Sequence, residues 1–509
     1  MYKILHIKVQ NYKSLENTQM EFWPNKNVFV WKNDSGKTNI LKAIRVIFQD
    51  KKIKKNDFFD TMKKIYISLT LEIWSEIFVL ETHARINKSE IELEYIIPKK
   101  IEEFYKQIQI VYIPSDRKHK DKDPKSWYHR LINLILENKE NTQLKNIYIH
   151  KILELWQIGK LSASKNTTLL ISLLELYLHT IKHAKSDWFK LFLLDQPENF
   201  LHPHATKHID NILGKIAELQ NTQIFYATHS PDLVSNFKKW IYEISDIIFV
   251  KKYNNSTQIK KIDNSHGKYN KIMINLIFKN ASIFFSDSVI LVEWETEKIA
   301  VPNIFENWKW KKSSYFWNQS IDRYDLESKN INIIDVWWKW ALADWYTFCS
   351  DIFWPENVFA IIDRDPDFFH DEEMISRAIY RTHWVKNISA KDFLQYHWVV
   401  LEWEFEYYYK EKKIFEYLRK VIQNRSEKFW ENRDPKKVEK SLEILDFRMK
   451  KVIQAKKISK AYAKLFWRYF RHYGKPTIAF NLSTYLSKND GYKKWLIEKF
   501  EYIVNKLEK

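Results

Sequence analysis

Residues Trp31 to Thr38 read W-K-N-D-S-G-K-T, which differs at one position from a phosphate-binding loop. With glycine in place of Trp31 the stretch becomes G-x-x-x-x-G-K-T, whose main-chain N–H groups surround the phosphates of a nucleotide. Such a loop needs residues without a Cβ, because the main chain must approach the phosphates closely or adopt positive φ angles. An indole cannot meet that need, so Trp31 stands where phosphate chemistry requires glycine.

The whole chain shows the same imbalance between tryptophan and glycine. It contains 22 Trp and 6 Gly in 509 residues, whereas ordinary usage predicts roughly 36 glycines. Glycine at Trp294 turns L-V-E-W-E-T-E-K into L-V-E-G-E-T-E-K, and glycine at Trp337, Trp338 and Trp340 turns D-V-W-W-K-W into D-V-G-G-K-G. We therefore hypothesise that the gene encodes glycine with UGA and that the printed chain translates UGA as tryptophan. The alternative is a genuinely tryptophan-rich chain, which UGG codons at these positions would establish.

In the loop with glycine restored, the side chains have distinct expected roles. Lys37 is predicted to contact the β and γ phosphates, and Thr38 to hold Mg²⁺. The other predicted nucleotide-binding positions of the loop and the following turn are Trp31 (read as glycine), Asn33, Ser35, Gly36 and Asn39.

Two later apolar segments end in polar residues that suit the same site. L-F-L-L-D-Q-P-E, starting at Leu191, reads as a buried strand ending at Asp195, whose carboxylate is predicted to complete the Mg²⁺ shell through water. Glu198 follows three residues later. I-F-Y-A-T-H-S-P, starting at Ile224, reads as the next strand, and His229 at its end is predicted to sense the γ-phosphate.

Acidic pairs follow two more apolar strands. Glu293 and Glu297 lie four residues apart at a strand-to-helix turn, so both can face one pocket. Asp363 and Asp365, in I-I-D-R-D-P-D, can reach a common ligand beyond their strand. Clustered carboxylates repel one another unless a cation neutralises them, and oxygen ligands suit Mg²⁺ or Mn²⁺. Two such ions can activate water and stabilise the leaving oxygen of a phosphodiester. Each pair taken singly also fits a solvated surface.

The elements that must position these residues form an α/β pattern. The first 50 residues read as strand, turn, strand, loop and helix, and residues 64–98 as short strands. Residues 250–282 read as a junction, after which a second α/β unit begins at S-V-I-L-V-E; the chain reads as helical and strongly charged from about residue 407. We expect an ATPase domain at 1–275 with an insert near 100–185 (a candidate dimerisation region), a nuclease domain at 283–409, and a helical region at 410–509 that completes the nuclease site.

These motifs resemble those of the OLD (overcoming-lysogenization-defect) family along nearly the whole chain. The glycine-restored loop with D-Q-P-E-N-F-L-H-P and A-T-H-S-P-D resembles the ABC-type P-loop ATPase head that this family shares with RecF and SMC proteins. V-E-W-E-T-E and I-I-D-R-D-P-D resemble a Rossmann-like TOPRIM domain, in which the family glutamate falls on Glu293 and the D-x-D on Asp363 and Asp365. The resemblance implies ATP and Mg²⁺ or Mn²⁺ as cofactors. Glu297, four residues after Glu293, is predicted from that spacing to be a further metal ligand.

Two late motifs extend the resemblance. L-E-W-E-F-E, read as L-E-G-E-F-E, is similar to the late acidic pair of OLD nucleases, which implies that Glu404 and Glu406 lie near a second metal. Y-G-K-P-T-I-A-F, starting at Tyr473, is similar to the late lysine motif, which implies that Lys475 stabilises charge building on the phosphate. Exposed helical charges are the alternative for both.

The chain departs from the ATPase pattern at two places. Gln196 occupies the catalytic position that such heads fill with glutamate, and a carboxamide cannot take a proton from the attacking water. We therefore expect slow hydrolysis, partial substitution by Glu198, or ATP acting mainly as a conformational ligand. The second departure is the family's Ser-Gly signature loop, which contacts ATP across a dimer. Its best candidate here is L-S-A-S-K, starting at Leu161, which contains neither glycine nor tryptophan.

Composition sets the remaining bounds. The net charge of +19 comes from 83 Lys+Arg against 64 Asp+Glu and favours polyanions, although an AT-rich genome also produces abundant lysine. The single cysteine, Cys349, allows no internal disulfide and reads as a core residue. No uncharged apolar run approaches the ~18–20 residues that span a bilayer, so we expect a soluble, cytoplasmic protein without membrane contact.

The favoured interpretation is an ATP-regulated, metal-dependent DNA endonuclease that forms homodimers or higher homo-oligomers. The family resemblance further implies a role in phage defence, as in Gabija-type systems, with a candidate partner helicase. The alternative is a nucleotide-sensing ABC-type regulatory ATPase with weak or no nuclease activity, which Gln196 favours. A primase or topoisomerase-like activity is disfavoured, because no active-site tyrosine module or primase zinc module is visible.

Overall fold

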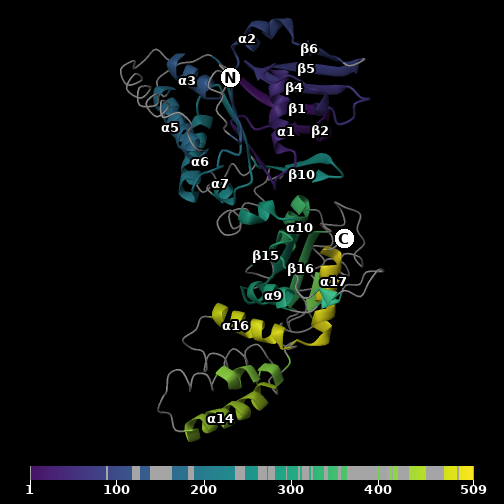
Figure 1. The fold of residues 1–509 in the computed structure, drawn as a ribbon, viewed down its shortest axis with the longest axis vertical. Helices are drawn as coiled ribbons and strands as arrows, with labels where there is room; N and C mark the ends of the chain where they lie inside the picture. Colours follow the sequence, from purple (N-terminus) through teal and green to yellow (C-terminus); the bar gives the residue numbers. More distant parts are fainter. Residues whose placement is uncertain are drawn as a thin grey trace. The chain divides into compact units, whose positions relative to one another are not determined.

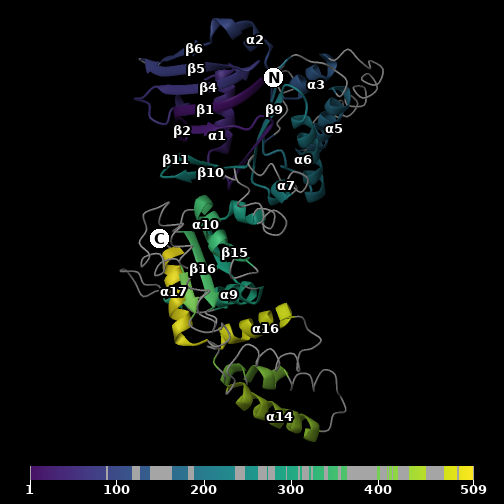
Figure 2. The ribbon, with the colours of Figure 1, turned by 180° about the vertical axis from the view of Figure 1, so that it is seen from behind.

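The computed structural model divides the chain into two compact units, Met1–Phe285 and Ser286–Lys509, drawn in Figures 1 and 2. Both units are mixed α/β, as predicted, because each contains a parallel sheet flanked by helices. The structure describes residues 2–87, 90–116, 127–137, 163–181, 188–235, 247–261, 272, 281–293, 295–307, 310–311, 320–321, 325–336, 342–353, 357–363, 398–401, 410, 412–414, 416–421, 435–453, 475–489 and 492–507.

The first unit contains a five-stranded antiparallel sheet in the order β2-β1-β4-β5-β6. Apolar and polar residues alternate along β1 and β4, so one face of the sheet is buried and the other faces solvent. Its strands are β1 (Tyr2–Tyr12), β2 (Leu15–Glu21), β4 (Ile65–Ile73), β5 (Glu76–Asn87) and β6 (Glu90–Ile96).

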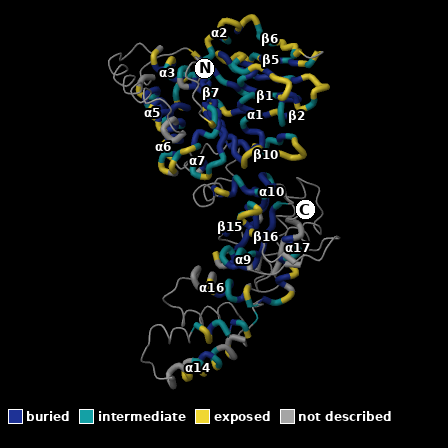
Figure 3. The backbone as a smooth tube through the Cα atoms, in the orientation of Figure 1, coloured by how far each residue is buried: buried dark blue, intermediate teal, exposed yellow. Residues whose placement is uncertain are grey.

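The second sheet of this unit has six strands in the order β11-β10-β3-β9-β8-β7. All run parallel except the edge strand β11, which pairs antiparallel with β10. Every residue of β3, β8 and β9 is buried, as expected for parallel strands covered on both faces. Exposed residues occur at the end of the β10–β11 hairpin (Figure 3). The strands are β3 (Lys26–Val30), β7 (Gln109–Ile113), β8 (Lys190–Asp195), β9 (Thr222–Thr228), β10 (Ile247–Tyr253) and β11 (Ser256–Lys261).

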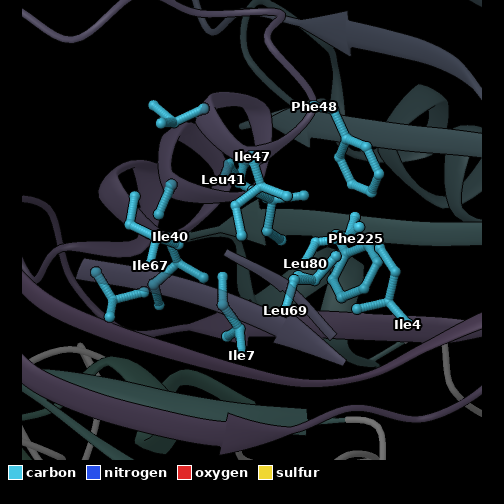
Figure 4. Packing of buried hydrophobic residues seen from close by; sticks show 14 of the residues in the cluster. Ile4, Ile7, Ile40, Leu41, Ile47, Phe48, Ile67, Leu69, Leu80 and Phe225 are labelled. Carbon is cyan, nitrogen blue, oxygen red and sulfur yellow. The ribbon is translucent and has the colours of Figure 1, made fainter. Parts of the chain in front are cut away.

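Helix α1 (Lys37–Ile47) lies between the two sheets and joins them into one core. Its apolar residues recur at helical spacing on two sides of the helix. Ile40 and Ile47 belong to one cluster of buried hydrophobic residues that also contains Ile67 of β4 and Phe225 of β9. Figure 4 shows this packing. Burial on two sides fixes α1, and with it the loop that precedes it.

Helices cover the opposite face of the six-stranded sheet (Figure 2). Tyr177 of α5 packs against Phe192 of β8, with ring centroids 5.3 Å apart. The helices and 3₁₀ turns of this unit are η1 (Lys55–Asp57), η2 (Lys99–Ile101), α2 (Glu102–Gln107), α3 (Trp127–Glu137), α5 (Ala163–Ile181), α6 (Pro203–Ala217), α7 (Pro231–Ser235) and η5 (Ala281–Phe285).

Residues 250–261, predicted as part of a junction, instead belong to the six-stranded sheet. They form the end of β10 and all of β11, joined by a tight turn between Tyr253 and Ser256. The prediction was wrong because K-K-Y-N-N-S-T-Q-I-K-K is polar, as an edge hairpin with solvent-facing side chains also is.

The second unit has a parallel sheet in the order β15-β12-β16-β17. Its core joins β12 and β16 to α9, α16 and α17, and Cys349 of α10 is buried, as predicted. Among the described residues, no helix is long and apolar enough to cross a membrane. The elements are β12 (Ser288–Val292), α9 (Glu295–Asn307), β13 (Trp310–Lys311), β14 (Ser320–Ile321), β15 (Ile331–Asp335), α10 (Leu342–Phe353), β16 (Val358–Asp363), β17 (Trp398–Leu401), α14 (Pro435–Ile453), α16 (Lys475–Lys488) and α17 (Lys494–Leu507).

Candidate nucleotide and carboxylate sites

The predicted phosphate loop has the local structure that its chemistry needs. It connects the buried strand β3 to the start of α1 at Lys37. Three of its residues have positive φ angles: 148° at Trp31, 60° at Asp34 and 107° at Gly36. Residues with a Cβ rarely adopt main-chain conformations with positive φ. The loop therefore has a conformation suited to glycine at its first position as well as at Gly36.

Trp31 is a large side chain placed on this strained main chain. It is 1% exposed, and its ring packs edge-on against Phe249 of β10 with centroids 6.4 Å apart. The Lys251 ammonium lies 5.9 Å from the indole centroid. A residue forced into such a φ region costs about 1–3 kcal/mol. This geometry supports the hypothesis that residue 31 is glycine in the native protein.

Gly36 is enclosed by side chains from two other segments. A Cβ at this position would lie 2.1 Å from Thr257 Oγ1 and 2.9 Å from Ser14 Oγ. Thr257 Oγ1 itself lies 2.7 Å from Ser14 Oγ and 3.1 Å from the Ser35 carbonyl oxygen, and Asn39 Nδ2 donates to Ser14 Oγ at 2.8 Å. The β10–β11 hairpin and the β1–β2 turn thus brace the loop, which sequence reasoning missed.

Lys37 folds back onto the loop that it follows. Its ammonium donates to the carbonyl oxygens of Trp31 and Lys32, each at 2.6 Å, and lies 3.3 Å from Ser35 Oγ. Burial lowers the pKa of Lys37 to about 8, although the negative charges of Asp195 and Glu198 oppose that shift. Its hydrogen bonds are therefore satisfied internally in this state, and a bound phosphate would have to replace them.

The predicted Mg²⁺ ligands of the nucleotide site lie together. Thr38 Oγ1 donates a hydrogen bond to Asp195 Oδ1 at 2.9 Å. Burial raises the pKa of Asp195, which the hydrogen bond from Thr38 and the charges of Lys42 and Lys37 oppose. A hydroxyl beside a buried carboxylate is an oxygen donor set that fits Mg²⁺.

Gln196 lies beside the loop, with both ends of its carboxamide engaged. Its Nε2 donates to Asn33 Oδ1 at 3.3 Å, and its Oε1 accepts from Asn199 Nδ2 at 2.8 Å. Its main chain has φ 50°. These contacts connect Asn33 of the loop to the segment after β8.

Glu198 and His229 meet at the ends of two neighbouring strands. Glu198 Oε1 accepts hydrogen bonds from Thr228 Oγ1 at 2.7 Å and from the main-chain N–H of His229 at 3.0 Å. The same oxygen lies 3.4 Å from His229 Nδ1. Burial raises the pKa of Glu198, and its hydrogen bonds and the nearby His229 oppose that shift.

The predicted carboxylates of the second unit are described in part. Glu293 directly follows β12 and Glu297 lies in the first turn of α9, with 7% and 5% exposure. Asp363 ends β16 beside Leu401 of β17. Because the strands are parallel, their carboxyl ends meet at the edge where such sheets bind ligands. The side chains of Asp363 and Lys475 lie outside the described residues, as do Leu161, Trp294, Trp337, Trp338, Trp340, Asp365, Glu404 and Glu406.

Asp335 is a further buried carboxylate at this edge. It ends β15, lies opposite Val292 in the register and is 7% exposed. Lys298 of α9 donates to its Oδ1 at 2.5 Å. The signal was present, because I-N-I-I-D is also an apolar strand that ends in aspartate. Within the described residues, no three acidic, histidine or cysteine side chains form a metal-binding group.

Three family matches cover both sites. Residues 2–173 match the family described as AAA ATPase domain, and residues 164–235 match AAA domain, putative AbiEii toxin, Type IV TA system. Residues 284–365 match Overcoming lysogenization defect protein-like, TOPRIM domain. The predicted order of an ATPase head followed by an OLD-like TOPRIM domain is confirmed.

Curated relatives share shorter stretches with this chain. Endonuclease GajA from Bacillus cereus is 40% identical over 78 residues, which cover 14% of this chain and 13% of GajA. DNA replication and repair protein RecF from Lactobacillus acidophilus is 49% identical over 39 residues, or 8% of this chain and 10% of that protein. RecF from Clostridium botulinum is 26% identical over 175 residues, or 33% of this chain and 45% of that protein. Each alignment spans less than half of the relative's length.

Similar solved structures include SMC heads. The SMC head domain from Thermotoga maritima is 14% identical, with a TM-score of 0.34, and the match covers 51% of this chain and 99% of that chain. The Smc head from Pyrococcus furiosus with an extended coiled coil, bound to the C-terminal domain of ScpA, is 11% identical, with a TM-score of 0.38, covering 53% and 100%.

Proposed function

Because this chain carries an AAA-type ATPase domain followed by an OLD-like TOPRIM domain, we propose that it is an ATP-regulated, divalent-metal-dependent DNA endonuclease. The observation that carries the proposal is the buried pair Glu293 and Glu297 at the carboxyl end of β12, in a chain that also holds a phosphate loop. Glutamate and aspartate oxygens are hard ligands that suit Mg²⁺ or Mn²⁺.

The residues of the second unit that would hold metal are Glu293, Glu297, Asp363, Asp365, Glu404 and Glu406. A divalent ion at these carboxylates supplies activation of water and stabilisation of the leaving oxygen of a phosphodiester. The carboxylates themselves bind and orient the ions, and Lys475 is assigned to the charge that develops on the phosphate. The net charge of +19 supports a polyanionic substrate, and DNA fits it.

The first unit is assigned to nucleotide binding. Lys37 and the loop N–H groups bind the phosphates, while Thr38 and Asp195 hold Mg²⁺, which neutralises phosphate charge. His229 is assigned to sensing of the γ-phosphate. We assign ATP to regulation of the nuclease, through homodimers or higher homo-oligomers of the head. A role in phage defence with a partner helicase belongs to the same proposal.

A plasmid-nicking assay tests the nuclease. The protein with glycine at positions 31, 294, 337, 338, 340 and 403 is incubated with supercoiled DNA and Mg²⁺ or Mn²⁺. Nicking is expected to disappear with a chelator and in Asp363→Ala, and to persist in Glu327→Ala, which removes an exposed carboxylate of the same unit. Lys37→Ala should remove the ATP dependence while leaving the metal dependence.

The second candidate is a nucleotide-sensing regulatory ATPase with little nuclease activity. Gln196 favours it, because the position next to Asp195 holds a carboxamide engaged by Asn33 and Asn199. ATP binding without metal-dependent nicking of DNA would select this function and reject the nuclease.

A further inference from the structure

We propose that Glu198 and His229 together form the proton-accepting pair of the ATPase site, in place of the carboxylate that Gln196 lacks. The inference rests on the proposed function, since it assigns residues to hydrolysis of bound ATP. It gives Glu198 a role in ATP hydrolysis, whereas binding of the phosphates by the loop does not require this residue.

Gln196 is unsuited to the task by chemistry and by its contacts. A carboxamide has no basic site near neutral pH for a proton from water. Its oxygen already accepts a hydrogen bond from Asn199, and its nitrogen donates to Asn33. Gln196 can hold the loop in place, but the base must come from another residue.

Glu198 is a carboxylate fixed by strand β9. Thr228 Oγ1 and the His229 main-chain N–H both donate to Oε1, at 2.7 and 3.0 Å. Oε2 is buried and accepts no hydrogen bond from any described residue. Thr228, which donates to Glu198, pairs in the sheet with Val30, the residue before the phosphate loop, so Glu198 lies beside that loop.

His229 connects this carboxylate to the accessible side of the site. Its Nδ1 is buried 3.4 Å from Glu198 Oε1 without a hydrogen bond to any described residue, whereas the whole side chain is 37% exposed. No hydrogen bond between Nδ1 and a described residue sets the tautomer of the ring, but the nearby negative oxygen favours the proton on Nδ1, which leaves the Nε2 lone pair as acceptor. Glu198 then stabilises the imidazolium that forms when Nε2 takes a proton.

The reaction balances with these two residues. The water oxygen forms a bond to the γ-phosphorus, and one water proton moves to His229 Nε2. The bond from the γ-phosphorus to the bridging oxygen breaks, and its electron pair leaves with ADP. The proton on His229 then passes to phosphate or solvent, which restores the pair. Glu198 is the positioning residue in this scheme, and His229 touches the reacting water.

Kinetics of Glu198→Gln test the pair in full-length protein with glycine at position 31. We expect kcat for ATP hydrolysis to fall at least tenfold, while affinity for ATP, measured by equilibrium dialysis, stays within threefold. Trapping of ADP with vanadate, which mimics the transition state, should be lost. The matched control is Glu175→Gln, which removes the carboxylate of an exposed pair with His208 (2.7 Å) in the same unit and should change neither value.

The outcomes separate this inference from the proposed function. His229→Ala, at a partly exposed side chain, should lose hydrolysis and trapping even if Glu198→Gln fails to fold. A kcat for ATP hydrolysis in Glu198→Gln within threefold of the parent value would contradict the proposed proton-accepting pair. A parent protein that binds ATP without hydrolysing it would contradict it as well. The nuclease function is tested separately, by nicking of DNA and its loss in Asp363→Ala, whatever the result for ATP hydrolysis.

Discussion

The ammonium nitrogen of Lys37 lies 2.6 Å from the main-chain carbonyl oxygen of Trp31. This contact joins the first and last parts of the phosphate loop and closes it on itself. Since the carbonyl belongs to a residue with φ 148°, the closed loop depends on main-chain geometry that glycine adopts without strain. Residue 31 therefore influences both the shape of the loop and the position of its lysine.

Replacement of Trp31 by glycine should restore nucleotide binding. The change relieves about 1–3 kcal/mol of main-chain strain and lets the loop open around phosphate. We expect affinity for ATP to rise at least tenfold, measured by titration with a fluorescent ATP analogue. Equal affinity of the printed chain and its Trp31→Gly variant would remove the basis for recoding at this position.

The codons offer an independent check on the same hypothesis. Trp74 and Ser75 form the two-residue turn between β4 and β5, with φ angles of 50° and 68°. Such turns favour glycine and asparagine because both central residues have positive φ. UGA is expected at codons 31 and 74, and UGG at codon 31 would contradict the recoding.

Gly36→Ala should disable the nucleotide site in the Trp31→Gly protein. The new Cβ meets Thr257 Oγ1 at 2.1 Å, on main chain whose φ of 107° disfavours any side chain. We expect at least a tenfold loss of ATP affinity, together with a lower melting temperature. Ala43→Gly, in the same helix but away from the loop, serves as the control: it should lower stability while leaving ATP affinity within threefold.

ATP binding should take up protons above neutral pH. The pKa of Lys37 falls from 10.5 to about 8 on burial in the empty site. Between pH 8 and pH 10.5, Lys37 is protonated in the unfolded chain but largely deprotonated in the folded one. Burial of Lys37 therefore destabilises the fold most below pH 8, and this destabilisation decreases as pH rises toward 10.5. Phosphate favours the charged lysine and draws the proton back.

Calorimetry at about pH 8.5, in two buffers with different ionisation enthalpies, measures that uptake. Lys37→Arg should bind without the Lys37-linked uptake, because arginine keeps its charge throughout this range. Equal proton uptake in the arginine variant would assign the effect to another group.

Lys298 should stabilise the second unit through Asp335. Lys298→Met leaves a carboxylate that is 8% exposed without this partner, at a cost of about 1–3 kcal/mol in the free energy of unfolding. Urea denaturation measures the loss, and adding Asp335→Asn should recover part of it. Lys494→Met, at an exposed pair with Glu498, should change stability by less than about 0.5 kcal/mol. Similar losses in the two lysine variants would argue against a special role for the Asp335 pair.

The positions of strand-end residues were predictable because parallel strands covered on both faces appear as uninterrupted apolar runs. Asp195, His229, Glu293 and Asp363 each end or directly follow such a run. Asp335 carries the same signal and was overlooked.

The bracing of the phosphate loop was not predictable from local pattern. Thr257 contacts Ser35 across 222 positions of sequence, and its own strand is short, polar and at an edge. The alternation in β1 predicted a strand, but it did not show that α1 lies between two sheets. Such packing depends on partners far away in the chain, about which a local pattern contains no information.

Helix α1 is held by β-structure on both sides. A displacement at its first residue, where phosphate would arrive, therefore cannot be absorbed by a loose helix end. A shift of α1 on gain or loss of a nucleotide would thus be transmitted to the strands of both sheets.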